Sequence, residues 1–382
     1  MNETYLDTKI KKTCNGCGVC ALVCPKKCIK MIEDEEGFLY PEIDKMECIN
    51  CGKCRKMCSN FPQKNEYQAK VYAAKNIDEN QRKNSTSGGM FKILVDYVIE
   101  QKGVIFGAEM DETFQVFHSF SDDIKECQKY SNSKYVRSNL KSTYSQVKEF
   151  LNQNRIVLFS GTPCQVYGLK IFVGKEYENL ILCEIVCHAN PSPKVLNMFI
   201  KNHEINAKKS VKEIYFRNKN KENGNGNYIE FDDGEKRDIK TYIRAFSEEH
   251  LINRPSCSEC KFVSKNRKAD FTIGDFWGID KFFMDFDDKK GISLLMINTD
   301  KADRIFSKIS KKIECREVDI EKAFMYNHNC NVPQSKHREK FFEGISNGFI
   351  NENNIIKIME KYTKKTIFIR AKWFFKRILK KF

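Results

Sequence analysis

The sequence has no apolar run that approaches the roughly 18 residues of a membrane-spanning helix. Its first twelve residues, MNETYLDTKIKK, are polar and lack the apolar segment of a secretory signal. It also has no internal repeat apart from two cysteine runs. Hydrophobic residues make up 41% of the chain and aromatic residues 12%, which is enough for a packed core. We therefore expect a cytoplasmic protein with two or three domains in its 382 residues.

The chain also lacks the concentrated stripe of Lys and Arg, interleaved with aromatics, that marks a nucleic-acid-binding surface. The formal net charge is +15, but nine of the basic residues lie in residues 361–382. Without that segment the charge falls to +6. The distribution of charge therefore argues against nucleic acid as a partner.

Cysteine, by contrast, is abundant: the chain has 17, an odd number. Without a secretory signal, a disulfide framework is not expected, and metal-bound thiolates in a reducing compartment fit better. Two runs, CNGCGVCALVC from Cys14 and CINCGKCRKMC from Cys48, follow the spacing C-x2-C-x2-C-x3-C.

This spacing is typical of ferredoxins with two [4Fe–4S] clusters, where the fourth cysteine of each run binds the other cluster. We assign one cluster to Cys14, Cys17, Cys20 and Cys58, and the other to Cys24, Cys48, Cys51 and Cys54. Gly16, Gly18 and Gly52 would let backbone amides approach the clusters closely.

A pair of zinc ribbons is the alternative, but structural zinc prefers two separated C-x2-C pairs. The spacing therefore favours iron–sulfur. Two details depart from the pattern: Ser59 stands where a proline usually follows the last cysteine, and an extra cysteine, Cys28, follows the first run. We interpret Cys28 as a packed thiol.

Beyond residue 62, short apolar runs alternate with helical patterns. The runs at 71–76, 104–110, 114–120 and 155–160 read as strands, and the apolar spacing after residue 89 predicts a helix that Gly103 closes. The strand at 155–160, the helix that continues through 168–174 and the strand at 179–188 predict a parallel βα unit.

Four later cysteines are predicted to converge. Cys164 and Cys187 follow the ends of two strands, where ligands gather in open α/β sheets, and Cys257 and Cys260 form a C-x2-C pair. Cys183 lies deeper in its strand and is predicted to be buried. The turn around Gly161 and Pro163 is expected to push Cys164 outward, which argues against a buried filler. As a nucleophile Cys164 would need a base such as His188, whereas ligation of a third cluster accounts for all four thiols.

Six segments resemble the coenzyme F420 hydrogenase/dehydrogenase beta-subunit family, in the family's order, from about residue 70 to 335. They are NSTSGGMF (84–91), SKYVRSNL (133–140), FSGTPCQVYGLK (159–170), IVCHANPSP (185–193), RPSCSEC (254–260) and DFTIGDFWGI (270–279). Ala189 departs from the glycine that the family more often has there. The family name does not fix the substrate, because bacterial relatives occur in organisms without the deazaflavin coenzyme.

The resemblance implies an iron–sulfur flavoprotein that binds FAD and a [4Fe–4S] cluster. A flavin accepts one or two electrons and so connects one-electron clusters to two-electron chemistry. Ser87, Gly88 and Gly89 open a helix that could hold the flavin pyrophosphate. Taken alone they fit an ordinary helix cap equally well, and the resemblance favours the flavin. Lys134 and Arg137 are candidate partners of the phosphates. Gly274, Asp275, Trp277 and Gly278 are expected to line the site, and His188 either donates a proton or orients a loop.

Together these observations predict an α+β protein, with a two-cluster ferredoxin domain (1–62) before a mixed α/β iron–sulfur flavoprotein domain. The latter comprises a flavin-binding part (70–150) and a part with the third cluster (151–335). We expect an oxidoreductase that takes electrons from a ferredoxin-like protein and passes them to FAD and a small-molecule substrate. The alternative is a non-catalytic electron-transfer subunit that docks on a separate reductase or hydrogenase.

The C-terminal segment 361–382 is basic and amphipathic. A helix is predicted from Ile367, and residues 364–382 are expected to contact the inner membrane face or a partner's groove. A helix packed on the protein itself explains the pattern equally well.

Overall fold

The computed structural model describes residues 3–59, 67–219, 226–327 and 330–363. The predicted amphipathic helix of residues 364–382 lies outside them. No helix among the described residues has the length and apolar character needed to cross a membrane.

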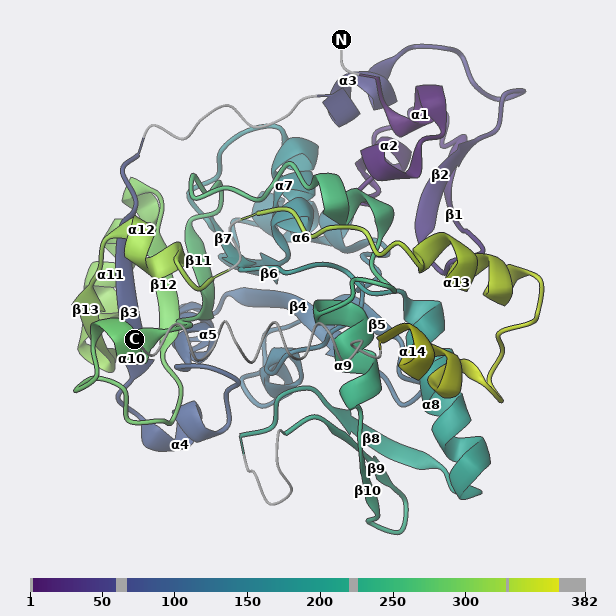
Figure 1. Cartoon of the computed structure of the whole chain (residues 1–382). Coiled ribbons are helices and arrows are strands. Elements are labelled where there is room, and N and C mark those ends of the chain that lie inside the picture. The colour runs from purple at the N-terminus through teal and green to yellow at the C-terminus, as the bar shows by residue number, and fades with distance from the viewer. Residues whose placement is uncertain (1–2, 60–66, 220–225, 328–329, 364–382) are drawn as a thin grey trace.

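A central mixed sheet of eight strands organises the chain (Figure 1). Its strands, in spatial order, are β13 (Ile313–Glu317), β3 (Lys70–Asn76), β12 (Ser293–Ile297), β11 (Phe271–Asp275), β7 (Leu180–Ile185), β6 (Val157–Gly161), β4 (Val104–Met110) and β5 (Val116–Ser121). Strands β4, β6, β7 and β11 are parallel, and the remaining neighbours pair antiparallel. The predicted βα unit is confirmed, because α7 (Pro163–Val173) connects the parallel strands β6 and β7.

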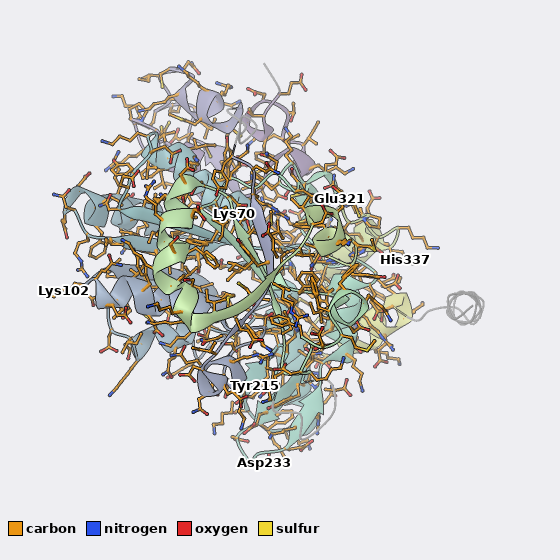
Figure 2. All side chains as sticks on the ribbon, turned by 90° about the vertical axis from the view of Figure 1, so that its left-hand side faces the viewer. Lys70, Lys102, Tyr215, Asp233, Glu321 and His337 are labelled. Atoms are coloured by element: carbon orange, nitrogen blue, oxygen red, sulfur yellow. The ribbon has the colours of Figure 1, made fainter. Side chains whose placement is uncertain are left out.

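Helices cover both faces of this sheet because its central strands are apolar on both sides. In β6, Val157 and Phe159 pack with α6 (Thr143–Asn152) and α7, whereas Leu158 packs on the other face. That other face is covered by α5 (Met90–Glu100) and α11 (Asp300–Ile309). Seen from the side, α11 crosses in front of the sheet (Figure 2). The mixed α/β fold predicted from the sequence is thus confirmed.

A second core surrounds a three-stranded sheet of β8 (Val211–Tyr215), β9 (Tyr228–Phe231) and β10 (Lys236–Asp238). It includes α8 (Pro193–Ala207), α9 (Lys240–Ser247), α13 (Arg338–Ser346) and α14 (Ile355–Thr363). Tyr215 and Asp233 mark this end of the molecule, opposite the cysteine-rich N-terminal part (Figure 2). The short helices that complete the body are α4 (Glu79–Lys83), η2 (Glu126–Tyr130), η3 (Pro255–Glu259), α10 (Ile279–Phe282), η4 (Ser310–Lys312) and α12 (Ile320–Phe324).

The N-terminal part contains α1 (Tyr5–Thr8), η1 (Lys11–Thr13), α2 (Val19–Leu22), α3 (Lys53–Ser59) and the hairpin of β1 (Ile29–Glu33) and β2 (Leu39–Ile43). This hairpin is held against the body at its turn. The buried carboxylate of Glu36 accepts hydrogen bonds from both terminal nitrogens of Arg338 in α13 (2.8 Å to Oε1), and its carbonyl accepts one from the Ser192 hydroxyl (2.5 Å). The N-terminal part is therefore fixed to the body by contacts with α8 and α13.

Candidate iron–sulfur relay and an adjoining cavity

The cysteines of the two N-terminal runs gather into the two groups that their spacing predicts. The first thiol set comprises Cys14, Cys17, Cys20 and Cys58, and the second comprises Cys24, Cys48, Cys51 and Cys54. The second set lines one cavity of about 480 Å3. In the first set, the pKa of Cys17 is raised to about 12, mainly by burial and in part by the nearby Cys14 and Cys58. The same neighbours act on Cys20.

One helical turn joins these two sets. Cys54 and Cys58 both lie on α3, four residues apart, so they share one face of the helix. Cys54 belongs to the second set, and Cys58 belongs to the first. Clusters bound by the two sets would therefore be neighbours, as the exchange of the fourth cysteine in ferredoxins requires.

The third thiol set comprises the four later cysteines, Cys164, Cys187, Cys257 and Cys260, and all four line a single pocket. Burial is the main cause that raises the pKa of the Cys187 thiol well above its usual range, and the three other cysteines contribute. Burial likewise raises the pKa of Cys260 to about 12, with contributions from Cys164 and Cys257. Neutral thiols are thus favoured in the metal-free pocket, and iron would have to displace their protons.

The position of Cys164 corrects one expectation from the sequence. We expected the turn to push it outward, but its relative exposure is only 8%. Helix α7 begins at Pro163 with a capping box between Thr162 and Gln165, which places Cys164 in the first turn. There it lines the same pocket as Cys187, Cys257 and Cys260. Cys183 is fully buried in β7, as predicted.

The first and third sets meet at α7. Gly168 lies one turn after Cys164, and a Cβ atom there would meet the Cβ of Cys17 at 2.9 Å. The charge of Cys164 accordingly contributes to the raised pKa of Cys17. The three sets therefore form a series, in which α3 connects the second set to the first and α7 connects the first set to the third.

Among the described residues, no group of three or more His, Cys, Asp or Glu side chains closes around a single metal ion. A [4Fe–4S] cube makes a different demand, because its four thiolates bind four separate iron atoms around a larger space. Four cysteines around one space are the ligands that bind such a cube. The residues of all three sets fit it.

The extra cysteine, Cys28, lies beside the second set. Its sulfur is 3.4 Å from the Cys24 sulfur, and its side chain is buried. It packs with Leu6, Cys20 and Ile29, which agrees with its interpretation as a packed thiol.

A large cavity shares no lining residue with the pocket of the third set. It has a volume of about 780 Å3, and the backbone from Ser131 to Lys134, helix α4 and the end of β8 contribute to its wall. We call it the basic cavity because its lining includes seven basic residues but only three acidic ones. The basic residues are Lys83, Lys92, Lys129, Lys134, Lys212, Arg217 and Lys219, and the acidic ones are Asp111, Glu112 and Glu213.

Half-buried cations carry the positive charge of the basic cavity. Burial lowers the pKa of Lys134 to about 8, and its ammonium donates to the carbonyls of Lys129 (2.9 Å) and Ser131 (2.8 Å). Burial also lowers the pKa of Lys219 to about 8. Its ammonium donates to the carbonyls of Arg82 and Ser87.

Only some of the residues predicted to bind flavin reach this cavity. Lys134 lines it directly. Asp275 pairs with Arg217, and Trp277 stacks on the Arg217 guanidinium (5.0 Å from its ring centroid), so both hold a cation that lines it. Sequence reasoning missed Arg217 and Lys219, although the alternation in FRNK at the end of β8 places both on one side of the chain.

The four glycines of the same prediction are explained by packing or by the backbone conformation at a helix start. The Gly88 amide donates to the Ser293 hydroxyl (2.8 Å), and a Cβ on Gly88 would meet the Ala74 carbonyl at 2.4 Å. A Cβ on Gly274 would meet Val186, and one on Gly278 would meet the ring of Tyr326. Ser87 donates to the carbonyl of Ile292 (3.0 Å), and Gly89 caps α5 with φ +86°. The Gly88 amide is thus already satisfied within the protein.

Arg137 lies at the thiols. Its guanidinium donates to the Cys164 sulfur and to the Gly16 carbonyl, both at 3.2 Å. His188 lines the pocket of the third set, and its Nε2 lies 3.4 Å from Nδ1 of His250. The segment Lys134–Arg137 therefore runs from the basic cavity to the third thiol set, and its two ends are at most about 11 Å apart at Cα.

Comparisons with known proteins match two parts of the chain to known families. Residues 154–323 match the family that describes the C-terminal part of the coenzyme F420 hydrogenase/dehydrogenase beta subunit, and residues 13–60 match the family described as "4Fe-4S dicluster domain". These matches confirm the resemblance that the motifs indicated. No curated protein sequence matches the chain.

Among solved structures, the chain is similar to one chain of the F420-reducing [NiFe] hydrogenase complex from Methanosarcina barkeri. The TM-score is 0.45 at 15% identity, and the alignment covers 79% of this chain and 94% of the other. The two family matches identify an iron–sulfur protein of the electron-transfer, oxidoreductase-like kind with a [4Fe–4S] dicluster domain at its N-terminus.

Proposed function

We propose that this chain is an iron–sulfur flavoprotein oxidoreductase that transfers electrons through three [4Fe–4S] clusters to FAD and a small-molecule substrate. The main support is the series of three thiol sets. The segment Lys134–Arg137 connects the last of these sets to the basic cavity. When bound, the clusters would supply one-electron transfer and the flavin would convert it to two-electron chemistry.

The thiol sets define the proposed order of transfer. The second set contains Cys51, which is exposed, so we infer that a donor protein delivers electrons there. The first set lies between the second and third, through α3 and α7. Cys164, Cys187, Cys257 and Cys260 hold the last cluster, beside the cavity.

The basic cavity supports the flavin part of the proposal. Its volume lies in the range of about 300–1,000 Å3 typical of small-molecule sites. Lys134, Arg217 and Lys219 would bind the pyrophosphate, because partly buried cations form strong charge-assisted hydrogen bonds with phosphate oxygens. Phe114 and Phe216 provide flat apolar surface in the same cavity. We place the pyrophosphate at these cations rather than at the Gly88 amide, which Ser293 already satisfies.

The test is anaerobic purification of the full chain, followed by quantitation of iron, sulfide and flavin. We expect about twelve irons, four for each cluster, and FAD at about one per chain, the stoichiometry that the family resemblance implies. Cys164→Ser should lower the iron to about eight, whereas Cys183→Ser, at a buried cysteine outside the three sets, should leave it at twelve. A Cys164→Ser protein that keeps all its iron and loses only turnover would make Cys164 a catalytic thiol.

The second candidate is a non-catalytic subunit that docks on a separate reductase. The family description, which names a beta subunit, favours it. The two candidates differ in whether the purified chain alone reduces a small molecule from a chemical electron donor. Retained clusters without flavin or turnover would support the second candidate.

A further inference from the structure

Two buried arginines lie between the first and third thiol sets. Arg137 has a relative exposure of 8%, and Arg254 one of 2%. A guanidinium stays charged under all ordinary conditions, and burying it without a counter-charge is costly. Buried arginines are therefore expected to have anionic partners.

The other buried arginines have such partners. Arg82 pairs with Asp288, Arg267 with Glu184 and Arg338 with Glu36. Among the described residues, neither Arg137 nor Arg254 forms an ion pair with a carboxylate. Their polar contacts are carbonyl oxygens and cysteine sulfurs instead.

Each of the two arginines contacts both the first and the third thiol set. Arg137 donates to the sulfur of Cys164, in the third set, and to the carbonyl of Gly16, in the loop of the first set (3.2 Å each). Arg254 donates to the carbonyl of Cys14, in the first set (2.9 Å), and its Nη2 lies 3.7 Å from the Cys14 sulfur. Its own carbonyl accepts from the amide of Cys257, in the third set (3.0 Å).

Both guanidinium groups are held in place by their surroundings. Arg254 lies 4.2 Å from the centroid of the Tyr40 ring and also donates to the Leu39 carbonyl (3.0 Å). Gly16 leaves it room, because a Cβ there would meet its guanidinium carbon at 2.9 Å. Arg137 is fixed through its amide, which donates to the Pro191 carbonyl (3.1 Å). Neither charge can therefore move away to solvent without disrupting packing.

We propose that Arg137 and Arg254 are the counter-charges of the third and first clusters, respectively, and that they raise the reduction potentials of these clusters. This inference rests on the proposed function, since it requires both clusters. A reduced cluster carries one more negative charge than the oxidised one, so a nearby fixed cation stabilises the reduced form. Hydrogen bonds to the sulfurs and local charge are known determinants of cluster potential.

Loss of either charge should lower one potential selectively. Arg137→Gln should lower the potential of the third cluster, and Arg254→Gln that of the first. Arg82→Gln is the matched control, because Arg82 is equally buried but pairs with Asp288, outside the three thiol sets. It should change neither potential.

The experiment is a redox titration of the full chain followed by electron paramagnetic resonance, with iron quantitation of every variant. The signal that Cys164→Ser removes identifies the third cluster. Twelve irons with a selectively lowered potential support the proposal, and twelve irons with unchanged potentials overturn it.

Arg137→Lys decides the case in which Arg137→Gln fails to hold its third cluster. A loaded Lys variant would show that the positive charge is required, in support of the proposal. Loss of the third cluster in both variants would make Arg137 a packing residue and overturn it. A wild-type chain with only eight irons would instead refute the third cluster, and with it the proposed function, before any arginine is changed.

Discussion

Cys17 packs against Gly168, one helical turn from Cys164, and this contact brings the N-terminal cysteines to the sheet. A Cβ at position 168 would meet the Tyr144 hydroxyl at 2.7 Å and the Cys17 Cβ at 2.9 Å. The contact between the first and third thiol sets thus depends on the absence of a side chain at residue 168.

Gly168→Val should therefore push the N-terminal part away from α7 while every thiol remains present. We expect the full iron content but weaker magnetic interaction between the first and third clusters, measured by electron paramagnetic resonance of the fully reduced chain. Lys170→Ala on the same helix, where the side chain points toward Glu176, is the control. Unchanged spectra in the Gly168 variant would show that the two sets are not coupled through this contact.

Cys28 offers a test of ligand assignment in the second set. Cys28→Ser should keep all the iron, because the other four cysteines already supply one ligand to each iron atom. Cys24 is the assigned ligand, but the Cys28 sulfur lies only 3.4 Å from it and could replace it. The double variant Cys24→Ser/Cys28→Ser should therefore lose about four irons. Loss of iron from Cys28→Ser alone would contradict the assignment.

The basic cavity should bind its anionic ligand less well in alkali. Lys134 and Lys219 have pKa values lowered to about 8 by burial, so both lose their charge as the pH rises through that value. FAD affinity, measured by fluorescence between pH 6.5 and 9.5, should fall above about pH 8. Lys134→Met should weaken binding about tenfold or more at pH 7, since a charged hydrogen bond contributes about 1.5–3 kcal/mol. Lys102→Met, an exposed change on the α5–β4 turn, should have no effect. Affinity that is flat across this range would exclude the two lysines as phosphate ligands.

His118 should make the protein sensitive to acid. Its ring is buried between the Ser160 carbonyl (2.9 Å) and the Ser138 hydroxyl (3.1 Å), and burial lowers its pKa to about 4. The unfolded chain binds this proton near pH 6.5, so stability from His118 is present above that value and is lost as the pH falls toward 4. The full loss is on the order of 3 kcal/mol.

His118→Phe should remove this sensitivity at some cost in stability at neutral pH. The measurement is the difference in thermal midpoint between wild type and variant, taken at pH 7 and again at pH 5. That difference should shrink at pH 5. At this pH the unfolded wild-type chain binds a proton at His118 that the folded protein does not bind, which destabilises the wild type and not the variant. A constant difference would mean that His118 does not titrate on unfolding.

The sequence predicted what local spacing determines. The two N-terminal thiol sets follow from eight cysteines within 45 residues, and the βα unit from apolar runs beside a turn. The roles of Arg137 and Arg254 were not predictable in this way, because their partners Gly16 and Cys14 are 121 and 240 residues away. The sequence also indicated Gly88 as a phosphate-binding position, because the actual partner of its amide is distant in the sequence. Its amide is satisfied by Ser293, 205 residues further along the chain.

The ion pair between Glu36 and Arg338 has a consequence for synthesis on the ribosome. The N-terminal hairpin emerges first, yet the arginine that neutralises its turn is made 302 residues later. Until then the Glu36 carboxylate lacks its bidentate partner, and the hairpin lacks this contact with the body. Iron inserted into the N-terminal thiols during translation would therefore enter them before this docking contact exists, and the proposed relay would be connected through it only after Arg338 has been made.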